Sequence, residues 1–342
     1  MLSHDYYNNI HGAVYFPSRA YNAYQIYRDF SPEECLRDFS YAQKAKINAL
    51  RIFTSYEFWQ EDAEGFFCRF DQLLDCAYKY QIQVMSVLFE DCGLPNTIEN
   101  RNSRHPLEAI CVRSPGAAIE QDPLRWKEAE AYVSAFFARY ADDPRLLAIE
   151  VMNEPHHQRG NLPFAKHLVR YAAQLKRTVP ITLGCINIED NLCFADEIDI
   201  FQFHDNFPAT IAQLQDKLNT AKAIQEISGK PCWITEWQRL RPTGPGWHMA
   251  DIPEEDKTPC LASMSDTIYK SGLGNFFWSL MVKPAYLKAQ RINGTFNGLF
   301  HEDGTVYSHK DFIAISGNST VPMETPTMPA WYLSDLTGLK NK

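Results

Sequence analysis

The sequence predicts a single (β/α)8 barrel, and three features of the chain support this prediction. Short apolar runs of strand length alternate with longer amphipathic segments along almost the whole chain. The apolar runs are nearly continuous, as is typical of parallel strands that are covered on both faces. No glycine-rich phosphate loop follows any of these runs, and its absence argues against the alternative, a flat doubly wound sheet.

Eight apolar runs are predicted to be strands. In chain order they cover residues 12–16, 48–53, 82–89, 146–152, 180–184, 198–203, 232–235 and 275–281. Helical or loop material follows each run, so we expect parallel strands that close into a barrel. Residues 1–317 are assigned to the barrel, and the Pro-, Ser- and Thr-rich tail 318–342 is expected to pack on its outside.

The amphipathic segments between the runs are predicted to be helices. Ser31 and Glu34 have the spacing of a capping box, with a proline at the first helical position between them. Asp122 and a following proline begin another predicted helix. Further helices are expected within residues 160–178, 208–228 and 255–272.

The composition excludes several classes of partner. The chain has 342 residues, with 33 basic and 42 acidic ones, a net charge of -9 and no basic run, so nucleic acid is not an expected partner. No apolar stretch is long enough to span a bilayer, and the N-terminal segment lacks the features of a signal peptide. The nine cysteines are scattered without CxxC pairs, which indicates reduced thiols and a cytoplasmic location. No cofactor is expected, and the oligomeric state stays open.

Two of the predicted strands end on a glutamate. "LLAIEVMNEP" ends the fourth strand with Asn153, Glu154 and a proline, and "CWITEW" ends the seventh with Glu236. These strands lie on opposing walls of a closed barrel, so their carboxylates can converge on one bond. Two carboxylates about 5–5.5 Å apart suit retaining hydrolysis of a glycosidic bond, which needs one protonated and one ionised group. Arg51, at the end of the second strand, can keep a neighbouring carboxylate charged.

The longest irregular segments all follow strand ends, where a barrel carries its active site. They come after the third, seventh and eighth strands, at residues 90–121, 237–254 and 282–307. Glu90 and Asp91 end the third strand on the same rim, and Tyr15 lies at the end of the first. We therefore include these three residues among the candidate substrate-binding residues.

The strand-end residues resemble those of the clan A glycoside hydrolases, nearest to family five, which contains cellulases and mannanases. Asn153-Glu154-Pro, the strand-seven Glu236 in "ITEW", Arg51 on the second strand and Trp278 in "FFWSL" carry the resemblance, which spans residues 11–313. It implies that Glu154 is the acid/base and Glu236 the nucleophile. It also implies that Asn153 donates a hydrogen bond to the sugar 2-hydroxyl and that Arg51 keeps the nucleophile ionised.

Other positions match the family or depart from it. His204, which ends "FQFH", corresponds to the strand-six histidine of the family's pocket, and Trp278 corresponds to the tryptophan under the reacting sugar. Trp237, beside the predicted nucleophile, is a further candidate for binding. The family usually has a tyrosine two residues after its strand-six histidine, where this chain has Asn206, and a histidine after strand three, where it has Glu90 and Asp91. The chain is thus an atypical match, with an unusual binding site for the reacting sugar.

The predicted function is retaining hydrolysis of β-linked oligo- or polysaccharides by double displacement, without a metal. A transglycosylase would use the same two glutamates with a sugar acceptor in place of water. A non-catalytic carbohydrate-binding barrel would gain nothing from two converging ionisable groups. A metal-dependent barrel hydrolase would need clustered histidines at strand ends, and only His204 qualifies. The sugar and linkage are left open, although the long loops favour a pocket that is closed on one side.

Overall fold

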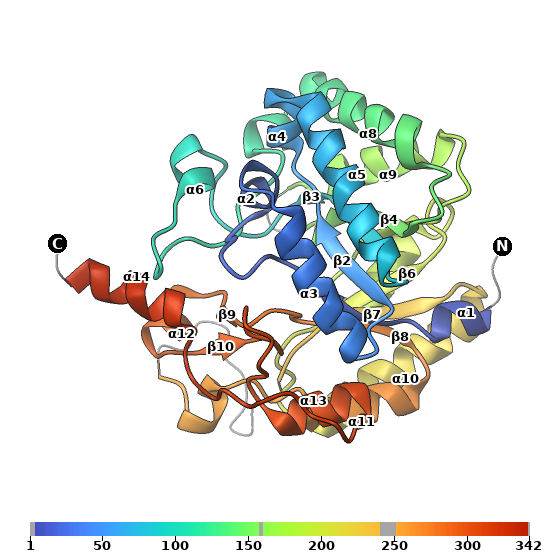
Figure 1. Ribbon diagram of the computed structural model, residues 1–342. Coiled ribbons are helices and arrows are strands. Elements are labelled where there is room, and N and C mark those ends of the chain that lie inside the picture. Colours follow the sequence, from blue (N-terminus) through green and yellow to red (C-terminus); the bar gives the residue numbers. More distant parts are fainter. Residues whose placement is uncertain (1–3, 157–159, 240–250, 341–342) are drawn as a thin grey trace.

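The computed structural model describes residues 4–156, 160–239 and 251–340, which form a barrel of parallel strands inside a layer of helices (Figure 1). All eight predicted strands are confirmed. They are β1 (His11–Val14), β2 (Ala49–Phe53), β3 (Gln83–Glu90), β4 (Leu146–Asn153), β5 (Ile181–Gly184), β6 (Phe201–Asp205), β7 (Cys232–Trp237) and β8 (Gly274–Phe277).

The order of the strands is that of a (β/α)8 barrel. The sheet runs β5-β4-β3-β2-β1-β8-β7-β6, and each pair of neighbours is parallel. One parallel bridge, between Thr182 and Ile200, joins β5 to the start of β6. The Thr182 hydroxyl also donates a hydrogen bond of 2.8 Å to the Ile200 carbonyl. This contact closes the barrel, and the predicted fold class is confirmed.

Helices follow most strands and cover the barrel. The longer ones are α3 (Pro32–Lys44), α5 (Ala63–Lys79), α8 (Trp126–Tyr140), α9 (Leu162–Gln174), α10 (Ile211–Ser228), α11 (Ala262–Ser271), α13 (His309–Ser316) and α14 (Ala330–Lys340). The shorter elements are α1 (His4–Asn8), α2 (Ala23–Arg28), α4 (Tyr56–Glu61), α6 (Ile98–Asn102), α7 (Ala117–Glu120), η1 (Pro123–Arg125), η3 (Ile188–Phe194), η4 (Glu254–Lys257), α12 (Lys288–Ile292), β9 (Lys283–Pro284) and β10 (Phe296–Asn297). Ser31 caps α3 by accepting a hydrogen bond from the Glu34 amide at 3.1 Å, whereas the Glu34 carboxylate pairs with Arg37. Only half of the predicted capping box therefore forms.

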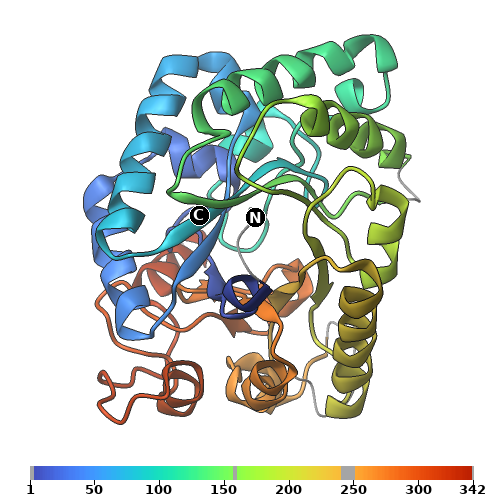
Figure 2. The same ribbon diagram turned by 90° about the vertical axis from the view of Figure 1, so that its right-hand side faces the viewer.

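The N-terminal end of the barrel is filled by apolar side chains. Ala49, Met85, Ala148, Ile200, Trp233 and Phe276 pack there in one buried cluster. A Cβ on Gly12 would lie 2.3 Å from the Phe276 ring, so the ring fits only because residue 12 is glycine. Helix α1 lies over this end (Figure 2), and the Trp233 indole donates a hydrogen bond to the Tyr7 carbonyl at 3.0 Å. The filled end leaves the opposite end of the barrel for a functional site.

The C-terminal tail packs beside the loop that follows β8. Tyr332 of α14 is fully buried in a cluster with Val282, Phe296 and Tyr307, all of which precede the tail. In the described parts of the chain, no helix has both the length and the apolar character that a membrane span requires. All nine cysteines are free thiols. Most of the long loop predicted after the seventh strand, residues 240–250, lies outside the described residues.

Candidate active site

Arg51 of β2 lies at the centre of a buried network of charges. Its guanidinium is fully buried and donates from Nη1 to Glu236 Oε1 at 2.6 Å. Nε and Nη2 donate to the two carboxylate oxygens of Glu150 at 2.7 and 2.5 Å, and Nη2 also donates to Asn153 Oδ1 at 2.6 Å. The guanidinium of Arg51 and the carboxylate of Glu236 thus form a buried ion pair across the barrel.

Glu150, the second carboxylate bound to Arg51, was missed by the sequence reasoning. It lies on β4, four residues before Glu154, and is completely buried. A Cβ on Gly184 of the neighbouring strand would lie 2.3 Å from Glu150 Oε1, so the carboxylate needs glycine at that position. The sequence does contain a signal for this pair. A carboxylate within an apolar strand requires a buried cation, and Arg51 likewise lies within the apolar strand "NALRIF".

The predicted nucleophile, Glu236 of β7, is bound through both carboxylate oxygens. Oε1 accepts from Arg51, and Oε2 accepts a hydrogen bond of 2.9 Å from Asn206 Nδ2. Gln238 orients this amide by donating to Asn206 Oδ1 at 2.8 Å. Asn206, which departs from the family pattern, thus contacts Glu236 directly.

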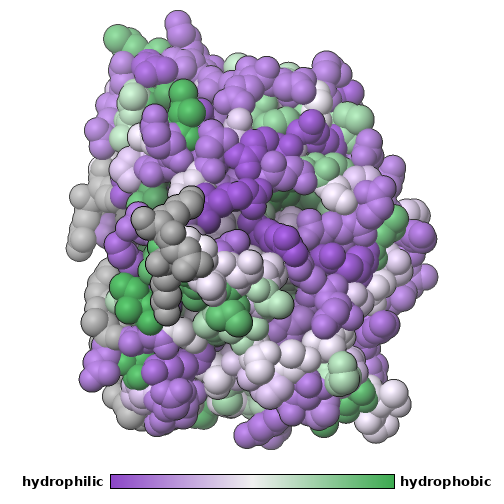
Figure 3. All heavy atoms as spheres, turned by 60° about the vertical axis from the view of Figure 1, so that its left-hand side comes forward, coloured by the Kyte–Doolittle hydropathy of each residue, from purple (hydrophilic) through white to green (hydrophobic). Residues whose placement is uncertain are grey.

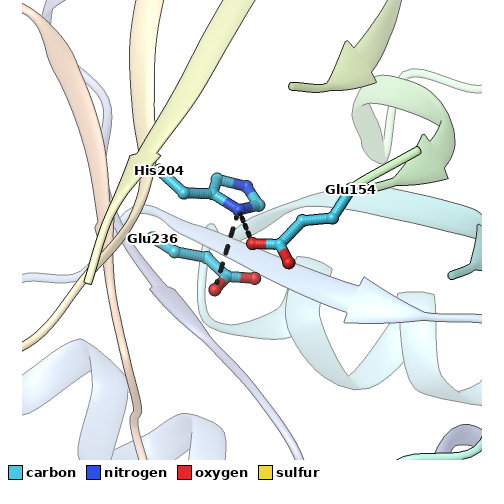
Figure 4. A group of neighbouring side chains, drawn as sticks. All are labelled: Glu154, His204 and Glu236. Atoms are coloured by element: carbon cyan, nitrogen blue, oxygen red, sulfur yellow. Dashed lines mark hydrogen bonds and ion pairs between the residues drawn. The ribbon is translucent and has the colours of Figure 1, made fainter. Parts of the chain in front are cut away.

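Glu154, the predicted acid/base, extends from the end of β4 in a strained conformation. Its φ of 46° lies in the left-handed region, which is rare outside glycine and is often found at functional sites. Its amide donates to the Gly184 carbonyl at 2.8 Å. Oε1 lies 2.6 Å from His204 Nδ1, and Oε2 accepts a hydrogen bond of 2.8 Å from the Cys92 thiol. The same His204 nitrogen lies 3.8 Å from Glu236 Oε2, so both carboxylates approach one ring nitrogen (Figure 4).

Glu154 and His204 share one proton. Burial alone would raise the pKa of Glu154, but the hydrogen bond and charge of His204 outweigh it and lower the pKa to about 2. Burial disfavours protonated His204, yet the two nearby glutamates raise its pKa overall. These opposite shifts favour an ion pair of the Glu154 carboxylate with protonated His204. The 2.6 Å contact is short enough for a proton to move between the two groups.

The spacing of Glu154, His204 and Glu236 differs from that of a zinc site. One ligand atom from each of the three lies within 4.8 Å of the others. Ligands at about 2.0–2.1 Å from a tetrahedral zinc ion would be spread further apart than the 2.6 Å between Nδ1 and Oε1. A proton fits this gap, so the cluster is arranged for proton sharing.

A cavity of about 380 Å³ lies above this network at the C-terminal end of the barrel. Its lining includes both predicted catalytic glutamates and consists of Phe53, Glu90, Cys92, Gly93, Cys111, Asn153, Glu154, His156, Ile186, Asn206, Glu236, Gln238, Trp278, Tyr286 and Leu287. A larger hollow of about 620 Å³ lies near Trp331 and is lined by neither glutamate. We therefore take the smaller cavity as the candidate active site.

The predicted binding residues differ in whether their side chains line the cavity. Glu90 and Trp278 line the cavity, whereas Asp91 and Trp237 are not among the described lining residues. Trp237 follows the lining residue Glu236 on β7, and adjacent strand residues point to opposite faces. Asp91 lies just past the end of β3. Trp237 is fully buried, and its indole donates to an asparagine of β8 at 3.2 Å.

Tyr15 is also placed away from the cavity. Its side chain is fully buried in the layer between β1 and the outer helices. The hydroxyl donates to Asp38 of α3 at 3.0 Å, and the ring contacts Phe39 edge to face. A sugar in the cavity does not meet this residue.

Glu90 places a buried carboxyl group in the cavity wall. Its Oε1 accepts hydrogen bonds from the Cys92 amide at 2.7 Å and from Asn153 Nδ2 at 2.8 Å. Burial raises the pKa of Glu90 well above its usual range, and the charges of Glu154 and Glu236 raise it further. Burial thus favours the protonated form of Glu90, in which the second oxygen can donate a hydrogen bond to a sugar hydroxyl.

Several lining residues lie in loops and were not predicted from the sequence. Cys92, Cys111 and Tyr286 reach the cavity from the segments that follow β3 and β8. Burial, reinforced by the charge of Glu154, raises the pKa of the Cys92 thiol well above its usual range, so the thiol stays protonated and acts as a donor. Neither cysteine has a flanking motif, and only the strand-end position of Cys92 could have suggested it.

Comparison with solved structures identifies similar folds. A glycoside hydrolase family 5 mannosidase from Rhizomucor miehei aligns with a TM-score of 0.60 and 14% identity, covering 97% of this chain and 94% of its own. An exo-β-1,4-mannosidase from an Opitutaceae bacterium aligns with a TM-score of 0.61 and 14% identity, over 90% of this chain and 58% of its own. An endo-β-1,4-mannanase from Thermotoga petrophila has a TM-score of 0.55 and 17% identity, over 79% and 68%.

Comparison at the level of sequence identifies no relative of this chain. No protein-family model matches the chain, and no curated protein matches it in sequence. The likeness is therefore carried by the arrangement of the whole barrel rather than by sequence identity. The chain has the same (β/α)8 barrel fold as these mannosidases and the mannanase.

Proposed function

We propose that this chain is a retaining glycoside hydrolase that acts on β-linked oligo- or polysaccharides. One observation carries the proposal: Glu154 and Glu236 enter one cavity from β4 and β7, with a carboxylate oxygen of each within 4.8 Å of the other. Retaining enzymes place their carboxyl groups about 5–5.5 Å apart, whereas inverting enzymes need about 6.5–9.5 Å to admit a water molecule. The short separation favours the retaining mechanism.

In the first step, Glu236 attacks the anomeric carbon. Arg51 and Asn206 bind one carboxylate oxygen each and so hold the nucleophile in a fixed orientation. The bond to the glycosidic oxygen breaks, and its electron pair stays on that oxygen. The proton passes from His204 through Glu154 to the leaving oxygen, so the released sugar departs as a neutral alcohol.

In the second step, water cleaves the glycosyl-enzyme. Glu154 accepts a proton from water and passes it to His204, which restores the starting pair. The water oxygen bonds to the anomeric carbon, and Glu236 leaves as a carboxylate. A sugar acceptor in place of water would give transglycosylation, and the two reactions use the same protein groups.

The cavity offers matched contacts for one sugar ring. Trp278 presents a partly exposed indole on which the apolar face of a sugar can stack. Asn153 donates one amide hydrogen to Glu90, which leaves its second hydrogen for the sugar 2-hydroxyl. Because the named structural neighbours are mannanases and mannosidases, we propose β-mannosides as the first substrates.

The nine free thiols support a reducing compartment such as the cytoplasm.

The test is hydrolysis of aryl β-glycosides of mannose, glucose, galactose, xylose and glucosamine, with the product anomer identified by NMR before mutarotation. The proposal predicts release of the β-anomer from at least one of these substrates. Release of the α-anomer would mean inversion and contradict the mechanism. If no substrate is cleaved and yet one binds, a carbohydrate-binding barrel would explain the protein better.

A further inference from the structure

The long loops that follow β3 and β8 meet and bind one another above the barrel. The Cys111 thiol donates a hydrogen bond to the Tyr286 hydroxyl at 3.1 Å. Lys288 pairs with Glu108 at 2.7 Å. Arg291 donates from Nη1 to the Ala109 carbonyl and, at 3.3 Å, to that of Pro106. We refer to these contacts between segments 106–111 and 286–291 as the loop junction.

Two buried basic side chains fix the segment that follows β8, and one of them binds the loop junction. Arg291 is 5% exposed, and its Nε donates to the Ala285 carbonyl at 2.5 Å, so one guanidinium binds carbonyls of both loops. Lys283, also buried, donates from Nζ to three carbonyls of the loop after β1, at 2.6 to 2.9 Å. Both residues lie in "VKPAYLKAQR", where solvent-exposed loop charges would be the ordinary expectation. Their burial indicates a fixed wall.

The C-terminal tail covers the outside of the loop junction. The hydroxyl of Tyr332, in α14, donates to the Pro106 carbonyl at 3.0 Å. Helices α6 and α14 and strands β9 and β10 all lie at the same end of the molecule (Figure 1). Viewed from this side, hydrophilic residues predominate and hydrophobic ones occur in separate patches (Figure 3). The tail therefore supports the loop wall from behind.

The loop junction forms one wall of the catalytic cavity. Cys111, Tyr286 and Leu287 all line the cavity, and the first two are the hydrogen-bonded pair. Strands β1 and β2 lie between β8 and β3 in the barrel, so the wall stands on their side. The opposite side is lined by residues that follow β4 to β7, among them Ile186 and Gln238.

This wall sets the direction in which a sugar chain can lie. A sugar stacked on Trp278 has its anomeric carbon at Glu236 and its glycosidic oxygen at Glu154, which follows β4. The leaving group then extends toward the side of β4 to β7, and the far end of the sugar points toward the loop junction. A second sugar on that end would have to occupy the space of Tyr286 and Cys111.

On the basis of the proposed function, we infer that the loop junction limits the glycone side of the cavity to one sugar and makes the enzyme exo-acting. It removes single sugars from the non-reducing end of a β-linked chain. The Tyr286 hydroxyl accepts from Cys111 and keeps its own hydrogen for a terminal hydroxyl of that sugar. Recognition of the free chain end is thereby built into the wall.

The first test compares two β-1,4-linked hexasaccharides of the sugar that the enzyme prefers. One has a free non-reducing end, and the other carries a methyl ether on the terminal O4. We expect the free chain to yield monosaccharide and pentasaccharide as the only early products and the blocked chain to react at least 100-fold more slowly. Early fragments of two to four sugars, or equal rates on both chains, would overturn the inference while leaving hydrolysis established. Failure to cleave any β-glycoside would overturn the proposed function, and with it this inference.

A pair of variants tests the role of the wall itself. Replacing Cys111 and Tyr286 together by alanine opens the wall but leaves the Arg291 contacts intact. We expect the ratio of blocked-chain to free-chain cleavage to rise at least tenfold. Lys288→Ala is the matched control, because its pair with Glu108 is more than half exposed and neither residue lines the cavity. An unchanged ratio in a folded double variant would contradict the role of the wall, and if that variant fails to fold, the blocked hexasaccharide still decides.

Discussion

Replacing Arg51 by lysine should destabilise the protein strongly, although the charge is conserved. Arg51 makes four hydrogen bonds to three fully or largely buried partners. A lysine ammonium is a single point and cannot span Glu150 and Glu236 at the same time. At least two charge-assisted hydrogen bonds are lost, each worth about 1.5–3 kcal/mol. We therefore expect a loss of about 3–5 kcal/mol, the range found when a buried ion pair is broken.

The measurement is urea unfolding at neutral pH, with Arg19→Lys as the control. Arg19 also makes two hydrogen bonds to a carboxylate, that of Glu302, but its side chain is 59% exposed. Exposed ion pairs contribute about 0–1 kcal/mol, so the control should unfold almost like the wild type. If Arg51→Lys lowers the free energy of unfolding no more than Arg19→Lys does, the buried network does not have the role assigned to it.

The groups around the cavity lead to three further predictions. The Glu154–His204 pair should stabilise the fold most between pH 4.3 and 6.5, which are about the pKa values of the two groups in the unfolded chain. Its contribution falls at lower pH because Glu154 becomes protonated, and at higher pH because His204 loses its proton. In urea titrations, the loss of stability in His204→Gln should therefore be largest near pH 5.5. Glu90→Gln keeps a hydrogen-bond donor at the cavity wall and should reduce turnover less than tenfold. Glu90→Ala should change the relative rates on epimeric glycosides, whereas Asp91→Asn should not, because only Glu90 is among the described lining residues. Equal effects of Glu90→Ala and Asp91→Asn would contradict the placement of these side chains. Turnover should survive EDTA, and activity that is lost on chelation and restored by a divalent ion would support a metal mechanism instead.

The barrel and its central residues were predictable because they follow from local pattern. Parallel strands covered on both faces appear in the sequence as continuous apolar runs, and a polar residue at the end of such a run is expected at the rim of the barrel. Glu154, Glu236 and Arg51 were found in this way. Alternation along β7 also explains why Trp237 lies away from the cavity that its neighbour Glu236 lines.

The cavity wall could not be predicted in the same way. The loop junction depends on contacts between residues 175 to 185 positions apart in the chain, and irregular segments have no periodicity that fixes their partners. Lys283 and Arg291 bind backbone carbonyls, which every residue provides, so the sequence does not indicate their acceptors. Glu150 was predictable only in part. Its position in an apolar strand was visible in the sequence, but its pairing with Arg51 depends on the closed barrel.

The most direct test of the central claim is the configuration of the glycosyl azides formed by two variants. In Glu236→Ala, azide can enter the vacated space and displace the aglycone directly, which gives an azide of inverted configuration. In Glu154→Ala, the nucleophile remains, an activated aryl glycoside still forms the glycosyl-enzyme, and azide intercepts it with net retention. We predict inversion from the first variant and retention from the second. The same configuration from both variants, or the reverse assignment, would contradict the roles of Glu236 as nucleophile and Glu154 as acid/base.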